Sequence, residues 1–230
     1  MNALQTEFRR LYAPHGPADA PDRVRAIVLE VLSPPGWSVL SRVWQEVQAT
    51  LGLPAPAIAV SGTDGMQLWF SVAASVPAET ARAFLQGLCR RFVPDLEDRH
   101  LRLWPHGAEH APPVPAPRGM DGNWSAFVAP DLAPVFADTP WLDVPPGDEG
   151  QASLLRGLQP MKPGDFDRAC RALSPAAPAV AMPPASAAPP AAPGTGEVDA
   201  RSFLRRVLND ESAPLALRVE AARTLLQHPG

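Results

Sequence analysis

Residues Ala57–Val72 (AIAVSGTDGMQLWFSV) constrain the fold of this chain more than any other segment. Two runs rich in β-branched and aromatic residues, Ala57–Val60 and Met66–Val72, flank the short segment Ser61–Gly65 (SGTDG). A glycine-containing link between two such runs is typical of a β-hairpin. We therefore expect a tight strand–turn–strand unit at the centre of a small sheet.

The flanking segments alternate between strand and helix patterns. Strands are expected at Arg25–Leu32, His100–Trp104 and Trp124–Val128, and longer helices at Trp37–Leu51 and Pro77–Phe92. Shorter helices are expected around Leu4–Leu11, Asp131–Phe136, Gln151–Leu158 and Phe166–Leu173, with a proline-rich loop at Pro105–Pro117. This order predicts an α/β fold of the α+β kind, with a small mixed sheet and helices packed on one of its faces.

Proline divides the chain into parts. Between Pro175 and Gly196, seven Pro and nine Ala occupy 22 positions, a composition that favours an extended spacer. We expect an N-terminal helix and tail at 1–20, the α/β domain at 21–174, a disordered linker at 175–197 and a helical hairpin at 198–230 that binds a protein partner. The hairpin pattern FLRRVLNDESAPLALRVEAARTLLQHPG resembles a segment of small phage packaging proteins.

Charge and hydropathy exclude some classes of function. The net charge is −4, which argues against strong non-specific binding to a phosphate backbone. The sequence has no run of 18 apolar residues, so we expect no membrane contact and a cytoplasmic location. Cys89 and Cys170 fall in helix-like patterns and suggest neither a disulfide framework nor a metal site.

The hairpin also contains the residues that are best suited to bind a ligand. The glycines Gly62 and Gly65 allow close backbone approach, and free amides in such a turn can bind an anion. The pleat of Met66–Val72 places Leu68, Phe70 and Val72 on one face of the strand and Gln67, Trp69 and Ser71 on the other. A polar and aromatic face suits a nucleotide or a single strand; an ordinary hairpin turn beside a half-exposed tryptophan is the alternative.

The segment Ser61-Gly62-x-x-Gly65-x-Gln67 resembles the hairpin of primase-polymerases of the archaeo-eukaryotic primase superfamily, which reads Ser-Gly-x-x-Gly-x-His. In that superfamily the hairpin follows a metal-binding strand and a helix. Here it follows the expected strand Arg25–Leu32 and the expected helix Trp37–Leu51 in the same order. The resemblance covers roughly residues 22–136, since Arg118 and the run Trp124–Leu132 resemble the end of the polymerase domain of bacterial end-joining ligases. It implies a primase-like fold and a nucleotide site.

The departures from that family matter for activity. The resemblance places the paired metal-binding aspartates at Glu30 and Leu32, the third aspartate near Leu103 and Trp104, and the phosphate-contacting histidine at Gln67. Two-metal phosphoryl transfer needs several converging carboxylates. We therefore expect no catalytic residues, no cofactor and no metal site beyond the remnant Glu30, so that the chain is an enzyme, with Mg²⁺, only if its metal ligands have moved.

Other candidate residues have weaker patterns. His106 and His110 flank Glu109, but the surrounding prolines and glycine forbid the helix that would bring them together, and solvated loop residues are the expected outcome. Among the paired arginines, Arg90/Arg91 at the end of the helix after the hairpin are best placed to meet a phosphate.

Three functions remain open from the sequence. The first is a non-catalytic primase-like domain that binds nucleic acid or a nucleotide weakly, or scaffolds a DNA-handling assembly. The second is a protein-interaction module without a nucleotide site, and the third is an active nucleotidyltransferase. The binding candidates are Ser61, Gly62, Gly65, Gln67, Trp69, Arg118, Arg90 and Arg91.

Overall fold

The computed structural model describes residues 2–14, 22–107, 109–118 and 122–174, all of which belong to one compact unit of the chain. Statements about the structure below concern these residues. The expected linker at 175–197 and the expected helical hairpin at 198–230 lie outside the described residues.

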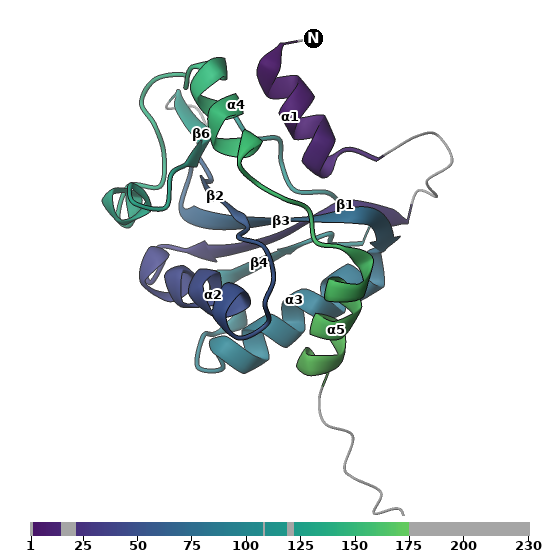
Figure 1. Cartoon of the computed structure of the whole chain (residues 1–230). Helices are drawn as coiled ribbons and strands as arrows, with labels where there is room; N and C mark the ends of the chain where they lie inside the picture. Colours follow the sequence, from purple (N-terminus) through teal and green to yellow (C-terminus); the bar gives the residue numbers. More distant parts are fainter. Residues whose placement is uncertain (1, 15–21, 108, 119–121, 175–230) are drawn as a thin grey trace, which may run out of the picture. The chain divides into compact units, whose positions relative to one another are not determined.

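A six-stranded sheet forms the centre of the described fold (Figure 1). Its strands run in the order β4-β1-β3-β2-β6-β5, and each pairing between neighbours is antiparallel. The strands are β1 Arg23–Leu32, β2 Ala57–Val60, β3 Gly65–Pro77, β4 Leu101–Trp104, β5 Ala116–Arg118 and β6 Asn123–Val128. The α+β class is confirmed, whereas the expected mixed sheet is wrong.

The helices cover both faces of this sheet, not one as expected. They are α1 Ala3–Tyr12, α2 Trp37–Ala49, α3 Ala78–Phe92, α4 Asp148–Arg156 and α5 Pro163–Leu173. Helices α2, α3 and α5 lie on one side, and α1 and α4 on the other (Figure 1). The physical reason is that both faces of the central strands carry large apolar side chains, which must be removed from water.

The hairpin shows this two-sided burial most clearly. Ala57 pairs with Trp69 and Val60 with Met66, so β2 and β3 form the expected strand–turn–strand unit. Leu68 and Phe70 belong to the core beneath α2 and α3. Trp69 belongs to the second core, beneath α1 and α4. The pleat was therefore predicted correctly, but its second face is interior.

Several expected elements differ at their ends. The expected helix at Asp131–Phe136 is only a 3-10 turn, Ala133–Phe136, and a second such turn, Asp98–His100, precedes β4. The end of the expected proline-rich loop forms β5. Pro77 is the last residue of β3 and the N-cap of α3 rather than its first helical residue.

Helix α1 is part of the domain instead of a separate N-terminal tail. The buried guanidinium of Arg25, on β1, donates to the carbonyl oxygens of Arg10 (3.0 Å) and Ala13 (2.8 Å) at the C-terminal end of α1. Arg10 in turn donates to the carbonyl oxygens of Leu155 and Leu158 at the end of α4. Carbonyl groups at the ends of α1 and α4 that have no partner within their own helix accept these hydrogen bonds, and the bonds attach α1 to the sheet and to α4.

A glutamine side chain completes the sheet where β5 stops. Gln151, on α4, accepts from the amide of Phe127 (2.7 Å) and donates to the carbonyl oxygen of the same residue (2.9 Å). Its side chain takes the place of a strand neighbour for β6. Since Gln151 is buried, these two backbone groups depend on it for their hydrogen bonds.

We predict that Gln151→Leu lowers the free energy of unfolding by about 2–4 kcal/mol, because it leaves the buried amide and the buried carbonyl of Phe127 without a hydrogen-bond partner. Urea unfolding followed by circular dichroism measures this loss. The exposed Gln45 on α2 offers a matched control, and Gln45→Leu should change stability by less than about 0.5 kcal/mol. Equal effects of the two substitutions would contradict the bridging role of Gln151.

Candidate functional site

The hairpin turn is closed by its own first residue. Ser61 Oγ accepts from the amides of Thr63 (3.1 Å) and Gly65 (3.0 Å), and the Ser61 amide donates to the Gly65 carbonyl oxygen (2.9 Å). The amide of Gly62 donates to the carbonyl oxygen of Pro140 (3.0 Å). These four amides are therefore occupied, which corrects the expectation of an open anion site in the turn.

Behind the turn, polar side chains form a connected row that we call the buried polar chain: Trp69, Gln67, Glu30 and Arg102. Trp69 Nε1 donates to Gln67 Oε1 (2.8 Å), and Gln67 Nε2 donates to Glu30 Oε2 (3.1 Å). Arg102 Nη1 donates to Glu30 Oε1 (3.3 Å). Trp69, Gln67 and Glu30 are each 2% exposed, so this is an interior network with its hydrogen bonds made.

The strand register explains why these residues meet. Glu30 on β1 stands opposite both Gln67 on β3 and Arg102 on β4, and all three side chains share one face of the sheet. Gly65 leaves the space that the carboxylate needs, because a Cβ there would lie 2.4 Å from Glu30 Oε1. Arg102, with 44% of its side chain exposed, also pairs with Asp64 in the turn (3.0 Å), so that the buried polar chain reaches the surface at Arg102.

Burial raises the pKa of Glu30, and the hydrogen bond from Gln67 and the charge of Arg102 oppose this shift. Each carboxylate oxygen nevertheless has a donor. The paired and buried carboxyl group therefore presents no exposed oxygen to a ligand.

Arg118 lies over the hairpin turn. Its side chain packs on Gly62, where a Cβ would lie 2.5 Å from Arg118 Cγ, and its guanidinium donates to the carbonyl oxygen of Pro113 (2.5 Å). Gly62 has a φ of +82°, which also favours glycine at this position. Burial lowers the pKa of Arg118, while the Glu30 carboxylate opposes that shift.

Trp69 presents no open face for a base. Its ring centroid lies 5.3 Å from that of Tyr12, 5.7 Å from Phe127 and 5.9 Å from Phe8. The aromatic residues of α1 and β6 therefore occupy the positions at which a nucleotide would stack. The expectation of a nucleotide-facing sheet surface at Gln67, Trp69 and Ser71 is wrong because α1 covers it.

The structure separates the arginine pair from the hairpin residues. Arg90 and Arg91 lie in the last turn of α3, on the opposite side of the sheet from the buried polar chain. Arg91 donates to the carbonyl oxygen of Ala172 in α5 (3.0 Å). Arg90 lines a cleft between α3 and β4.

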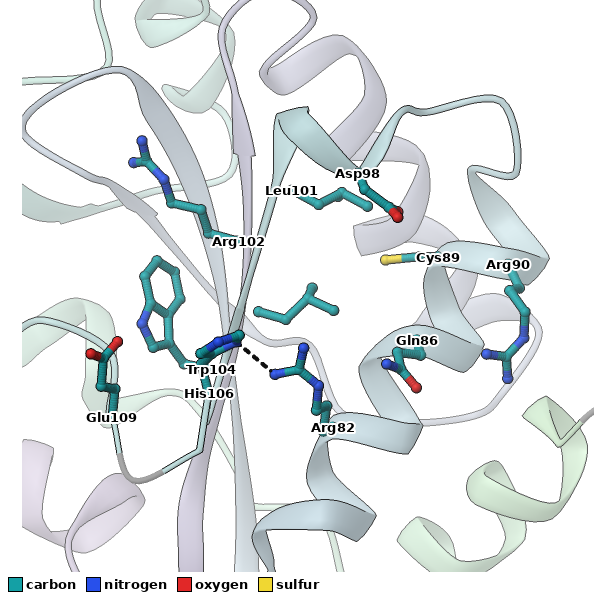
Figure 2. Close-up of a pocket in the computed structure, with 11 residues that line it drawn as sticks. Arg82, Gln86, Cys89, Arg90, Asp98, Leu101, Arg102, Trp104, His106 and Glu109 are labelled. Atoms are coloured by element: carbon teal, nitrogen blue, oxygen red, sulfur yellow. Dashed lines mark hydrogen bonds between the residues drawn. The ribbon is translucent and has the colours of Figure 1, made fainter.

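A cleft of about 590 Å³ lies between α3 and β4 (Figure 2). Helix α3 contributes Arg82, Gln86, Cys89 and Arg90 to it, and β4 contributes all four of its residues. His106, Glu109 and Asp98 complete the lining. Of these lining residues, the sequence predicts only Arg90 as a binding residue, and it offers His106 and Glu109 only as candidate metal ligands. The pattern along α3 does not by itself show that β4 lies beside it.

The metal-ligand candidates remain apart. Within the described ranges, no group of three or more His, Cys, Asp or Glu residues is arranged to hold a metal ion. The exposed His106 accepts a hydrogen bond at Nδ1 from Arg82 (2.8 Å). Cys89 and Cys170 are free thiols whose pKa burial raises to about 11.

Comparisons with known protein families and with curated proteins give no match to this chain. In the described part of the chain, no helix has the length and apolar character needed to cross a membrane. The roles of the residues above therefore rest on geometry and chemistry.

We predict that Gln67→Leu lowers the free energy of unfolding by about 2–5 kcal/mol, because it removes a partner from both Trp69 Nε1 and the Glu30 carboxylate. In the double variant Glu30→Leu/Gln67→Leu, the carboxylate and its amide partner are both absent.

Urea unfolding of Glu30→Leu, Gln67→Leu and the double variant measures the coupling between the two residues. The double variant should lose less free energy of unfolding than the two single variants together, by at least about 1 kcal/mol. Additive losses would contradict the buried polar chain.

We predict a pH dependence from Glu30. The pKa of Glu30 in the folded protein exceeds its ordinary value of 4.5, because burial favours the neutral carboxyl group. The contribution of Glu30 to the free energy of unfolding is therefore complete below pH 4.5, and it decreases as the pH rises through the raised pKa. Glu30→Gln cannot ionise, so the stability of the parent chain minus that of this variant should decrease over the same window. Urea unfolding across pH tests this, with Glu79→Gln, an exposed carboxylate on α3, as the control; a difference that grows with pH would contradict it.

Proposed function

We propose that the described domain is a non-catalytic protein-interaction module whose binding surface is the cleft between α3 and β4. The observation that carries this proposal is the closure of the hairpin face. Trp69 is enclosed by aromatic side chains, and the oxygens of Glu30 are engaged by Gln67 and Arg102. A binding function therefore needs another surface, and we favour the cleft between α3 and β4, which has a volume of about 590 Å³.

A relationship to primase-polymerases stays part of the proposal. The order β1, α2, β2, β3 supports it, because it places a strand and a helix before the glycine hairpin. The single carboxylate Glu30, opposite Gln67, supports a descendant that binds or scaffolds without phosphoryl transfer.

One observation favours a second candidate function, the binding of a nucleotide or a single-stranded nucleic acid in the same cleft. Arg82 and Arg90 line it, and among the described residues neither forms an ion pair with a carboxylate. Trp104, also in the lining, is only partly buried and has an aromatic ring for stacking.

Display of random peptides against the purified full-length chain tests the main proposal. We predict enrichment of short peptides whose affinity falls at least about tenfold in Gln86→Trp, since this exposed residue lies midway along the α3 wall and tryptophan would fill the cleft. Gln45→Trp on α2 is the matched control and should bind like the parent chain.

Fluorescence anisotropy with labelled single-stranded DNA at low salt addresses the second candidate. Oligonucleotide binding that is lost in Arg82→Ala/Arg90→Ala, and kept in Arg42→Ala, would support nucleic acid in place of a protein. Peptides that bind Gln86→Trp as well as the parent chain would overturn the proposed use of the cleft.

A further inference from the structure

The cleft beside α3 follows the outer edge of β4. Successive side chains of a strand point to opposite faces of the sheet, yet Leu101, Arg102, Leu103 and Trp104 all line this one cleft. A hollow confined to one face would meet only alternate residues. Figure 2 shows the strand from its edge, with Arg102 and Trp104 on one side and Leu101 on the side of Cys89.

That edge has no strand neighbour in the described part of the chain. Strand β4 begins the strand order, and its pairing is with β1 alone. In an antiparallel pair, every second residue turns its amide and carbonyl away from the partner strand. The turn after β4 closes on itself through the reciprocal backbone hydrogen bonds of His106 and Glu109 (3.0 and 2.9 Å), so these two residues do not use the edge.

The opposite wall of the cleft is one face of a helix. Arg82, Gln86, Cys89 and Arg90 lie at helical spacing on α3. A groove between a free edge strand and a helix is the geometry in which extended peptides bind by adding a strand, with backbone hydrogen bonds on one side and side-chain contacts on the other. Four residues of strand give an edge of roughly 13 Å, enough for a peptide of similar length.

The charges in the cleft select the peptide. Arg82 and Arg90 come from the α3 wall, where Arg82 donates to His106 Nδ1. The carboxylates Asp98 and Glu109 also line the cleft. Figure 2 places Glu109 beside Trp104, across from the α3 wall, and Asp98 between Leu101 and Cys89, at the end of the cleft away from Arg82. Side chains of an added strand that turn toward Arg82 and Arg90 would meet two guanidinium groups.

We infer that β4 accepts an extended segment of a partner protein as an additional strand, with carboxylates at alternate positions turned toward Arg82 and Arg90. The inference rests on the proposed interaction function and specifies its partner. The apolar parts of Leu101 and Leu103 lie on the same side of β4 and provide contact for the stems of those acidic side chains.

The test uses a synthetic, end-capped peptide in which Glu alternates with Val, and a second peptide with Lys in place of Glu. Anisotropy titration of the full-length chain should show binding of the Glu peptide and none of the Lys peptide. The variant Arg82→Ala/Arg90→Ala should weaken the Glu peptide at least about tenfold. Arg42→Ala, an exposed arginine on α2, should leave its affinity unchanged.

Backbone N-methylation separates strand addition from simple charge attraction. Methyl groups on the amides of one alternating set of peptide residues should abolish binding, while methyl groups on the other set should leave it within about twofold. Equal tolerance of both sets would overturn strand addition, even if displayed peptides still required the cleft, and the proposed function would then stand without this inference. Binding of single-stranded DNA through Arg82 and Arg90, without binding of either peptide, would overturn both.

Discussion

The hydrogen bond between Gln67 and Glu30 is the interaction on which the architecture of this domain depends. It satisfies a carboxylate that is 2% exposed at the centre of the sheet, and the same glutamine accepts from the indole of Trp69. With these groups paired, the second face of the sheet can be interior. Helix α1 then packs on Trp69 and Phe127 through Phe8 and Tyr12, and Arg25 holds its end.

Closure of that face removes it as a binding surface. The turn amides are used by Ser61 and Pro140, and the aromatic side chains of α1 occupy the surface over Trp69. We propose that a partner binds instead at the outer edge of β4, where Arg102 connects the buried carboxylate to the cleft. We propose that a surface suited to nucleotides in primase-like domains serves as a core here, and that recognition has moved to the sheet edge.

The sequence predicted the local elements well, because the signals that define them are local. The hairpin, the pleat of Met66–Val72 and the order of the long helices follow from periodicity and turn residues. It did not predict that α1 covers Trp69, because the amphipathic pattern of a three-turn helix does not indicate on which surface its apolar face packs. Arg102 was missed for a similar reason: only the register of β1 and β4 shows that it stands opposite Glu30.

The exposure of the Trp69 indole N–H in the full-length chain tests this account most directly. A ¹⁵N-labelled sample, with the indole signal assigned through Trp69→Phe, allows its hydrogen exchange to be measured with and without single-stranded DNA. We predict strong protection of this N–H by Gln67 and burial, and no shift of its signal on addition of DNA. Rapid exchange together with a DNA-dependent shift would contradict it, because the hairpin face would then be open to a ligand.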